Sequence, residues 1–453
     1  MADNLGDDPQ RSALFTDLYE LTMAQAYGAE AFAATAVFEL FFRKLPATRQ
    51  YVVAAGLDDV LNYLENFHVT DNDIAYLAKK ALFSRNFLQW FRELRFTGDV
   101  WAVPEGTPVF PNEPVVQVVA PIAEAQLIET LVLNQIHFQS VVATKAARIV
   151  RAAEGRAIVD FGSRRAHSAE AAMKAARVSY LAGAAGTSLV LAGKRYGIPI
   201  FGTMAHSYIQ AHDDETDAFR AFATIFPHTT LLVDTYDTLD GVRKVIQLSR
   251  QMGENFPVSA IRLDSGDLAD LANRARSMLD EAGLNKIGIF ASSELDEFAI
   301  QKLVRADAPI DGFGVGTSMA VSSDAPTLDM AYKLVEYSGK GRTKLSPHKF
   351  IYPGRKQVFR ETESGQMIRD TIARADETRP GAPQLIRVMR GGRRISENCA
   401  TLNEARDLAR RQLDALPNEY RQLEPGGAAY PVTISDALSD DLETLRGELK
   451  HRP

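Results

Sequence analysis

The middle of the chain alternates short apolar runs with stretches of helical periodicity. The runs are four or five residues long and recur roughly every 20–40 residues, which is the rhythm of parallel strands joined by crossover helices. The predicted strands are residues 157–161, 198–201, 230–233, 260–263, 287–291 and 312–315. Between the first two, residues 166–180 place an apolar stripe on one helical face, which predicts a helix packed on the sheet. The stripe consists of Ala166, Ala169, Met173, Ala176 and Tyr180.

The two ends of the chain have a different texture. Helical periodicity over residues 17–27 and 72–95 predicts one amphipathic helix in each, and apolar alternation broken by Pro and Gly over 98–119 predicts β-hairpins. Beyond residue 337 the chain is basic and polar. Strands are expected around Phe350 and at 357–360, a helix over 402–416, and a frayed tail after Leu445. These textures predict three regions, 1–125, 126–336 and 337–453, of which the middle one is an α/β barrel.

Composition narrows the class of protein. The 453 residues are 46% hydrophobic and 24% charged, which is typical of a globular protein and excludes a disordered chain, a fibre or a membrane bundle. The net charge of −7 argues against a nucleic-acid carrier. The single cysteine, Cys399, excludes a disulfide framework and a multi-cysteine metal site. The acidic N-terminus resembles no signal peptide and no apolar run reaches 18 residues, so a cytoplasmic protein without a membrane partner is expected.

Polar residues follow every predicted strand of the middle region. Barrel enzymes build their active sites from the loops after several strands, so the clusters predict a catalytic face. A single cluster would be explained by helix caps and turns, but six in register are not. The clusters are residues 160–165, 202–206, 234–237, 262–267, 292–294 and 314–318.

Each cluster has a functional and a structural interpretation. Arg164 and Arg165 suit a carboxylate or phosphate as paired donors, or they are solvated at a helix start. Asp234 and the Asp264-Ser-Gly-Asp run suit ribose hydroxyls or a hydrated magnesium ion, or they are N-caps. The Gly314-Val-Gly-Thr-Ser run suits phosphate, or it is a tight turn.

His206 ends an apolar run, where a hydrogen-bonded core histidine and a nucleophile or acid–base group are the alternatives. A metal pair with His212 is disfavoured, because six helical residues place the two about 240° apart. The segment from Gly186 to Lys194 is not a phosphate-binding Walker loop, since six residues separate its glycines where four are required. The chain contains no strand–GxGxxG–helix pattern, so a Rossmann dinucleotide site is not expected.

Taken together and in this order, the clusters resemble those of the nicotinate phosphoribosyltransferases, a family of type II phosphoribosyltransferases. The resemblance extends from the Thr16-Asp-Leu-Tyr-Glu-Leu-Thr-Met segment to Gly354-Arg-Lys-Gln-Val-Phe-Arg. Its motifs are Phe161-Gly-Ser-Arg-Arg, Gly202-Thr-Met-Ala-His, Val233-Asp-Thr-Tyr-Asp, Arg262-Leu-Asp-Ser-Gly-Asp-Leu and Gly314-Val-Gly-Thr-Ser. The resemblance implies an irregular parallel, TIM-like α/β barrel joined to a sheet-rich α+β domain formed from both termini.

The resemblance also implies roles for residues. His206 matches the family's phosphorylated histidine, and Asp264 is a catalytic carboxylate. Ser207 stands where some relatives have Glu, and it receives no role. The implied nicotinate-binding residues are Tyr19, Asp17, Phe161, Arg164, Arg165, Thr203 and Arg262. The implied ribose- and phosphate-binding residues are Asp234, Ser265, Gly266, Gly314, Gly316 and Thr317.

The implied enzyme joins nicotinate to phosphoribosyl pyrophosphate in the salvage route to NAD. Its products are nicotinate mononucleotide and pyrophosphate, and hydrolysis of ATP drives the reaction through a transient phosphohistidine. ATP and phosphoribosyl pyrophosphate are co-substrates and Mg²⁺ is the cofactor, with metal ligands that no motif identifies. The implied assembly is a homodimer in which Tyr19 reaches the partner's site.

Three alternatives stay open at this point. The base is nicotinamide or another pyridine, such as quinolinate, instead of nicotinate. A barrel lyase needs a catalytic lysine, for which Lys145 and Lys333 are the candidates, although both are better interpreted as phosphate or structural partners. A binding protein without activity predicts decay of the strand-end clusters, which are intact.

Overall fold

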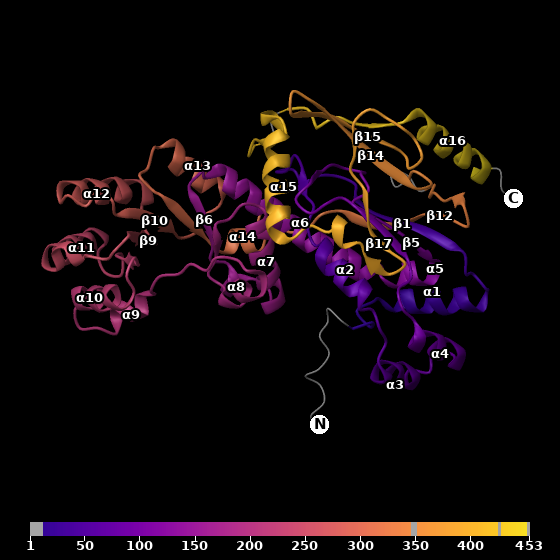
Figure 1. Cartoon of the computed structure of the whole chain (residues 1–453), viewed down its shortest axis with the longest axis horizontal. Helices are drawn as coiled ribbons and strands as arrows, with labels where there is room; N and C mark the ends of the chain where they lie inside the picture. Colours follow the sequence, from indigo (N-terminus) through magenta and orange to yellow (C-terminus); the bar gives the residue numbers. More distant parts are fainter. Residues whose placement is uncertain (1–11, 346–350, 425–426, 451–453) are drawn as a thin grey trace. The chain divides into compact units, whose positions relative to one another are not determined.

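The computed structural model describes residues 12–345, 351–424 and 427–450, which divide into two units. We call residues 142–326 the middle unit and the rest, which contains both ends of the chain, the terminal unit. The boundary at residue 141 falls within the long helix α6 (Glu129–Ala152). In Figure 1 the sequence colours show the indigo N-terminal and yellow C-terminal elements within the terminal unit.

The middle unit is built on a six-stranded parallel sheet in the order β7-β6-β11-β10-β9-β8, which confirms the predicted parallel arrangement. Its strands are β6 (Ala157–Asp160), β7 (Gly186–Thr187), β8 (Thr230–Leu232), β9 (Ala260–Leu263), β10 (Gly288–Ser292) and β11 (Gly312–Val315). The predicted strand at 198–201 is wrong in extent, because only Ile200 joins the sheet, through a single bridge to Thr187. In the part of the chain that the structure describes, β7 and β8 are the two edges, so closure into a barrel stays a prediction.

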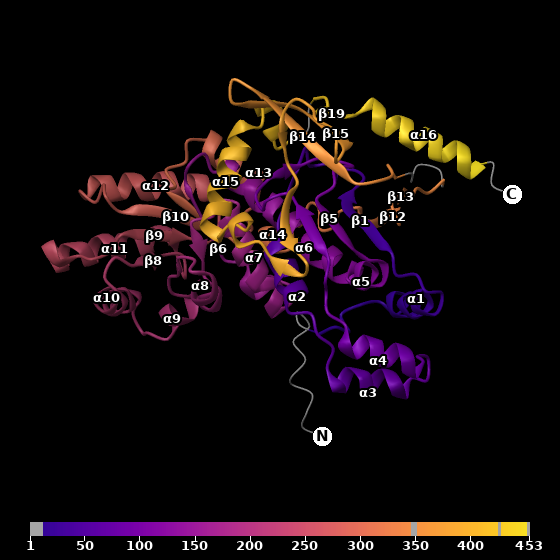
Figure 2. The same ribbon diagram turned by 45° about the vertical axis from the view of Figure 1, so that its right-hand side comes forward.

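Helices connect these strands, and several begin at a capping aspartate. Asp237, Asp267 and Asp296 each accept hydrogen bonds from backbone N–H groups of the first turn that follows. Helix α12 packs on β9 and β10 and lies beside α11, as both ribbon views show (Figures 1 and 2). The helices are α7 (Ala169–Leu181), α8 (Val190–Tyr196), α9 (His206–Gln210), α10 (Glu215–Ile225), α11 (Thr238–Met252), α12 (Leu268–Glu281), α13 (Glu297–Arg305) and α14 (Thr317–Ala320).

The predicted helix at 166–180 is displaced. Residues 163–165 form a short 3-10 turn, and α7 starts only after Ser168, whose hydroxyl accepts a hydrogen bond from the Ala171 N–H. Residues 172–179 are all buried, whereas Ala169 is exposed. The helix therefore has no single apolar face, because it packs against α8, α14, β7 and the 3-10 turn at once.

The terminal unit carries a seven-stranded sheet in the order β13-β12-β1-β5-β3-β17-β18. Both ends of the chain contribute to it, and β3 pairs antiparallel with β5, as the hairpin prediction requires. The strands are β13 (Lys340–Gly341), β12 (Met330–Tyr337), β1 (Thr35–Phe42), β5 (Val116–Pro121), β3 (Asp99–Ala102), β17 (Ile386–Arg390) and β18 (Arg393–Arg394). A second sheet has the order β16 (Ala382–Pro383), β14 (Lys356–Glu363), β15 (Gln366–Arg374) and β19 (Val432–Ile434), and β2 (Val52–Val53) pairs with β4 (Pro108–Val109).

Two predictions for this unit are wrong. The single helix expected over 72–95 is two helices, because Ala81 takes a left-handed φ of 55° and the Ser84 hydroxyl caps a new start. The tail does not fray after Leu445, since α16 continues to Lys450. Phe350 lies outside the described residues. The helices are α1 (Leu18–Ala29), α2 (Leu57–Glu65), α3 (Asp71–Lys79), α4 (Arg85–Glu93), α5 (Ile122–Leu127), α15 (Leu402–Ala415) and α16 (Asp436–Lys450).

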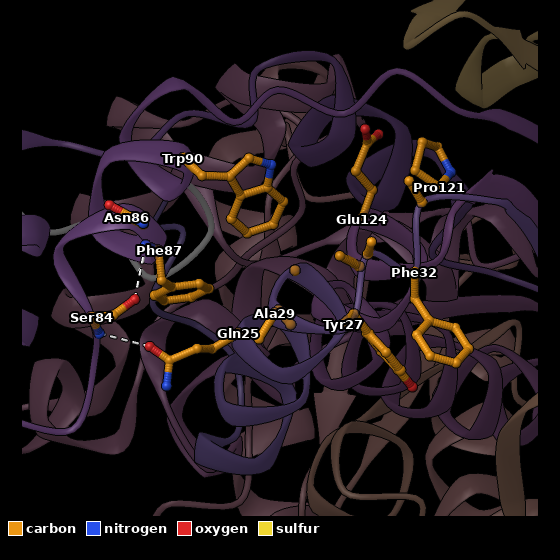
Figure 3. Close-up of a pocket in the computed structure, with 15 residues that line it drawn as sticks. Gln25, Tyr27, Ala29, Phe32, Ser84, Asn86, Phe87, Trp90, Pro121 and Glu124 are labelled. Carbon is orange, nitrogen blue, oxygen red and sulfur yellow. Dashed lines mark hydrogen bonds between the residues drawn. The ribbon is translucent and has the colours of Figure 1, made fainter.

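A pocket of about 450 Å³ lies between the C-terminal half of α1 and α4 (Figure 3). The rings of Tyr27, Phe32, Phe87 and Trp90 line it. At its edge the Gln25 side chain accepts a hydrogen bond from the Ser84 N–H at 2.7 Å and donates one to the Leu82 carbonyl at 3.3 Å. These bonds fasten the C-terminal half of α1 to the segment before α4.

Across the described residues, no helix has the length and apolarity needed to cross a membrane.

Candidate functional site

The ends of β8, β9 and β10 are joined by side-chain hydrogen bonds. Asp234, after β8, accepts at Oδ2 from the Asp264 N–H (2.8 Å) and from the Ser265 hydroxyl (2.7 Å). The Ser292 hydroxyl, at the end of β10, donates to Oδ1 of Asp264 at 2.5 Å. The predicted clusters of three neighbouring strands are therefore brought together. Oδ1 of Asp234 is buried and has no hydrogen-bond partner among the described residues.

His206 opens helix α9 beside this cluster. Its Nδ1 lies 3.1 Å from the Thr235 hydroxyl, and its Nε2 lies 3.6 Å from Oδ2 of Asp264. The second distance suits an ion pair but is too long for a hydrogen bond. The side chain is 42% exposed, which is unlike a core histidine. His212 instead bonds the Tyr208 carbonyl through Nδ1, so the two histidines do not form a pair.

This arrangement favours one state of the imidazole. A carboxylate beside Nε2 stabilises a proton on that nitrogen, which leaves the lone pair on Nδ1. The Thr235 hydroxyl can donate to that lone pair at 3.1 Å. In this tautomer Nδ1, rather than Nε2, carries the lone pair, which is open to an electrophile only when the Thr235 hydroxyl donates elsewhere.

Arg262 on β9 supplies a cation that is largely removed from solvent. Its Nη1 donates to the Thr203 hydroxyl at 2.7 Å, and its Nη2 lies 4.0 Å from Oδ2 of Asp264. Burial lowers the pKa of the Arg262 guanidinium, and the nearby carboxylates of Asp264 and Asp234 oppose that shift. Its Nε is buried without a hydrogen-bond partner in the described residues.

Phe161, directly after β6, forms a wall of an apolar cavity. The cavity has a volume of about 270 Å³, and Phe201, Thr203 and Phe290 also line it. The centroids of the Phe161 and Phe290 rings are 6.0 Å apart with an interplanar angle of 48°. A Cβ on Gly314 would lie 2.5 Å from the Phe161 ring, so the missing side chain at 314 makes room for that ring. The cavity suits a flat aromatic ring.

The remaining residues predicted in the middle unit lie in the loops after the strands, and none of them lines this cavity. Arg164 and Arg165 form the exposed 3-10 turn that follows Phe161. Gly266, with a left-handed φ of 81°, turns the chain from β9 toward α12. Gly316 immediately precedes α14, whose first residue is the exposed Thr317.

Asp17 and Tyr19 belong to the terminal unit, at the start of α1. Asp17 accepts a hydrogen bond at Oδ2 from the Thr130 hydroxyl at 2.9 Å. Tyr19 is 45% exposed, and its hydroxyl bonds the Glu129 carboxylate. Burial and the neighbouring carboxylates raise the pKa of Tyr19, so the phenol stays protonated.

Sequence reasoning missed several residues that support the site. Asp160 is buried and accepts from the Gly162 N–H and the Thr187 hydroxyl, both at 2.8 Å, and it thereby holds the turn that carries Phe161. Burial raises the pKa of Asp160. Asp160, Thr235 and Ser292 all stand within the strand-end clusters, so the motifs contained the signal. Phe290 lies inside an apolar strand and gave none.

The lysines weighed for lyase chemistry have other partners. Lys145 is buried in an ion pair with Glu297 and lies 2.9 Å from Asp324. Glu297 also pairs with Arg148 at 3.0 Å. Lys333 lies 3.5 Å from Glu129 in the terminal unit. Neither lysine follows a strand of the middle sheet, which removes the basis of the lyase hypothesis.

Comparisons with known proteins agree with these observations. Residues 14–137 match the nicotinate phosphoribosyltransferase N-terminal domain, and residues 156–344 match the nicotinate phosphoribosyltransferase family. A nicotinate phosphoribosyltransferase of Mycobacterium tuberculosis is 60% identical over 434 residues, covering 96% of this chain and 94% of that protein. The Bacillus subtilis nicotinate phosphoribosyltransferase is 45% identical over 77% of this chain and 73% of its own length.

Solved structures extend the likeness to the fold. The crystal structure of human nicotinic acid phosphoribosyltransferase superposes with a TM-score of 0.85 at 29% identity, covering 95% of this chain and 100% of that one. A nicotinate-nucleotide pyrophosphorylase from Pyrococcus furiosus gives a TM-score of 0.74 at 25% identity, with coverages of 90% and 97%.

Proposed function

Because the chain belongs to the nicotinate phosphoribosyltransferase family, we propose that it joins nicotinate to phosphoribosyl pyrophosphate in NAD salvage. The products are nicotinate mononucleotide and pyrophosphate. ATP and water are consumed alongside and leave as ADP and phosphate. The expected cytoplasmic location stays a prediction.

The largely buried positive charge of Arg262, at the end of a strand and bonded to Thr203, is the observation that carries the choice of base. The guanidinium is largely buried, and Thr203, to which it donates, lines the cavity whose wall is Phe161. A pyridine ring against Phe161 with its carboxylate toward Arg262 would place a negative charge beside that guanidinium. A neutral amide would leave the buried cation poorly paired, which costs a large share of binding. Arg164 and Arg165 are further candidates for the carboxylate.

The geometry at His206 supports the phosphohistidine step. In this proposal Nδ1 attacks the γ-phosphorus of ATP, the bond from that phosphorus to the bridging oxygen breaks, and ADP leaves. Asp264 holds the proton on Nε2 meanwhile. Water later cleaves the N–P bond and releases phosphate. The phosphorylated histidine adds negative charge beside Asp264, which offers a way to couple ATP to the sugar-phosphate site.

The transfer itself needs stabilised charges rather than a protein nucleophile. The ribose carbon becomes oxocarbenium-like as pyrophosphate leaves and the pyridine nitrogen attacks, and the carboxylates of Asp264 and Asp234 suit that positive charge. Ser265 and Gly266 would contact the ribose, and Gly314, Gly316 and Thr317 the phosphate.

Magnesium fits this site only with help from the substrate. In the described part of the chain, no group of three or more His, Cys, Asp or Glu could hold a metal ion. Mg²⁺ needs only one or two carboxylates when phosphate oxygens complete its shell. The residues that would hold it are Asp264 and Asp234. Oδ1 of Asp234 has no hydrogen-bond partner among the described residues. When bound, the ion would neutralise the leaving pyrophosphate.

We also propose that the middle sheet closes into the family's irregular barrel. We further propose a homodimer with shared sites, in which the second subunit supplies Tyr19 and Asp17. The dimer is tested by mixing Tyr19→Ala with His206→Ala subunits. Restored activity is expected, because one site in each mixed dimer contains both intact residues. No restoration despite demonstrated subunit exchange would contradict shared sites.

The activity is tested with each base separately, in the presence of phosphoribosyl pyrophosphate, Mg²⁺ and ATP. We expect kcat/KM for nicotinate to exceed that for nicotinamide and for quinolinate by roughly 100-fold or more. Equal efficiency with nicotinate and nicotinamide would overturn the assigned specificity, and no product with any base would overturn the activity.

A further inference from the structure

The first turn of α1 is clamped to the start of α6 by Thr130. The Thr130 hydroxyl lies 2.5 Å from Oε1 of Glu20 and 2.9 Å from Oδ2 of Asp17. Its backbone N–H also donates to Oε1 of Glu20 at 3.1 Å. The hydroxyl has one hydrogen to donate and the N–H supplies another, so Thr130 can bond Asp17 and Glu20, which flank Tyr19 in the sequence, at the same time.

Glu129, the neighbour of Thr130, holds Tyr19 itself. The Glu129 carboxylate acts on the Tyr19 hydroxyl, while Tyr19 is 45% exposed. The carboxylate is fixed in turn by the Gln126 amide, which donates at 2.7 Å, and by Lys333 at 3.5 Å. Tyr19 thus presents an exposed ring whose far end is tethered.

Glu20 anchors the same turn from the inside. It is fully buried, and the Thr16 hydroxyl contacts its second oxygen as well as the Leu127 carbonyl at 3.2 Å. A buried carboxylate that accepts several hydrogen bonds cannot leave its place cheaply. The backbone on both sides of Tyr19 is therefore fixed.

The opposite half of α1 has a separate attachment: Gln25 bonds Ser84 (Figure 3) and also the Leu82 carbonyl. The pocket beside those bonds is lined by Gln25 and by no residue of the Thr130 clamp. Gln25 therefore serves as a matched control, since its loss loosens the same helix at the end that carries no predicted site residue.

We propose that Thr130 and Glu129 are positioning residues, which fix Asp17 and Tyr19 in the geometry required to cover the pyridine ring of nicotinate. The inference rests on the proposed function, in which Tyr19 contacts that ring. Neither Thr130 nor Glu129 touches the substrate. Their effect reaches it only through the α1 turn.

The test is a split between KM and kcat in Thr130→Val, which keeps the side-chain shape and removes the hydroxyl. A misplaced Tyr19 weakens ground state and transition state alike. The KM for nicotinate is therefore expected to rise about tenfold, with kcat within about threefold of wild type. The KM for phosphoribosyl pyrophosphate should not change. Thr130→Ser restores the hydroxyl and should restore the nicotinate KM.

Two further variants separate positioning from stability. Gln25→Ala is expected to lower the melting temperature without raising the nicotinate KM. Glu129→Gln serves if Thr130→Val does not fold, and a smaller rise in KM is expected because an amide keeps the shape but binds the phenol less strongly.

Tyr19→Ala distinguishes the two ways of failing. If it raises the nicotinate KM while folded Thr130→Val and Glu129→Gln do not, the positioning role is wrong and the proposed function stands. If Tyr19→Ala also leaves every kinetic constant unchanged, the segment is not part of the site, and both the inference and the assignment of Tyr19 fall. An equal rise in KM in Gln25→Ala would mean that general loosening of α1 is responsible, which overturns the inference.

Discussion

Lys356 in the terminal unit and Arg262 in the middle unit are both cations removed from solvent, but their donors are used differently. The ammonium of Lys356 bonds Glu39 at 2.8 Å and the carbonyls of Tyr352 and Gly354 at 2.7 and 2.8 Å, so all three donors are occupied. Arg262 bonds Thr203 and leaves its buried Nε without a partner in the described residues. A saturated cation holds a fold together, whereas an unsaturated one beside a cavity awaits a ligand.

Arg360 extends the comparison within the terminal unit. Its guanidinium makes two bonds to Asp370 at 3.0 and 2.6 Å and a third to the Pro108 carbonyl at 2.8 Å. Both members of the ion pair are buried. The difference between Arg360 and Arg262 predicts that deleting Arg360 costs stability, while deleting Arg262 costs activity and leaves stability largely intact.

The largest effect is expected for Arg360→Leu. The variant leaves the carboxylate of Asp370 buried without its cation, so the free energy of unfolding should fall by about 3–5 kcal/mol in urea titrations. Arg369→Leu is the control on the adjacent rung of the same hairpin, where the pair with Glu361 is exposed and is worth about 0–1 kcal/mol. Equal losses in the two variants would break the contrast between saturated and exposed pairs.

Arg262→Gln is the converse experiment. Loss of the charge that faces the nicotinate carboxylate should lower kcat/KM for nicotinate by about 100-fold or more, equivalent to about 3 kcal/mol. The melting temperature should stay the same or rise. Arg274→Gln, an exposed arginine on α12, controls for surface charge. A variant of Arg262 that unfolds as readily as Arg360→Leu would show that Arg262 is structural.

His206→Asn tests whether His206 accepts the phosphoryl group of ATP. ATP should no longer label the protein with an acid-labile, base-stable phosphate. The KM for phosphoribosyl pyrophosphate should rise about tenfold while slow transfer without ATP persists, because the carboxylates that stabilise the oxocarbenium ion remain. His212→Asn is the control, since that ring bonds only a backbone carbonyl in the described hydrogen-bond pattern. A folded His206→Asn that still labels and still couples to ATP would remove His206 from the mechanism.

Some strands and contacts of the middle unit could be predicted from the sequence, and others could not. The strands β9 and β11 were predicted to the residue, because each is a short run, mostly apolar or glycine, bounded by polar turns. The clusters after β8 and β9 were expected to lie at one face of the sheet, and there the Asp234 carboxylate accepts a hydrogen bond from the Asp264 N–H. The strand β7 was missed, since two residues, Gly186 and Thr187, carry no periodicity. Its pairing depends on its neighbours in the sheet.

The pattern of apolar and polar residues could not predict side-chain contacts that depend on packing. The proximity of Phe161 to Phe290 depends on the missing side chain at Gly314, which sequence reasoning assigned to phosphate. The break in the helix expected over 72–95 contains no Gly or Pro, because the left-handed residue there is Ala81. Buried charges of the terminal unit, such as Glu20, look like ordinary surface positions until the fold surrounds them.

The last and most specific test uses Glu20. This residue belongs to the terminal unit, and folding shifts its pKa. Burial raises its pKa from 4.5 to about 7, and the hydrogen bonds from Thr130 and Thr16 only partly oppose this shift. The titratable groups that act electrostatically with it are Glu129, Tyr19, Tyr63 and Tyr332. The folded state therefore holds this proton more tightly than the unfolded chain does.

The consequence is a loss of stability as the pH rises. The contribution of Glu20 to the free energy of unfolding is fully present below about pH 4.5 and is lost as the pH passes through about 7. Glu20→Gln keeps the shape and does not titrate. Over this window wild type should therefore lose at most about 3 kcal/mol relative to the variant in urea titrations at matched pH. Parallel stability–pH curves for the two proteins would show that Glu20 titrates normally, and that its surroundings in the folded protein are as polar as those of an exposed carboxylate.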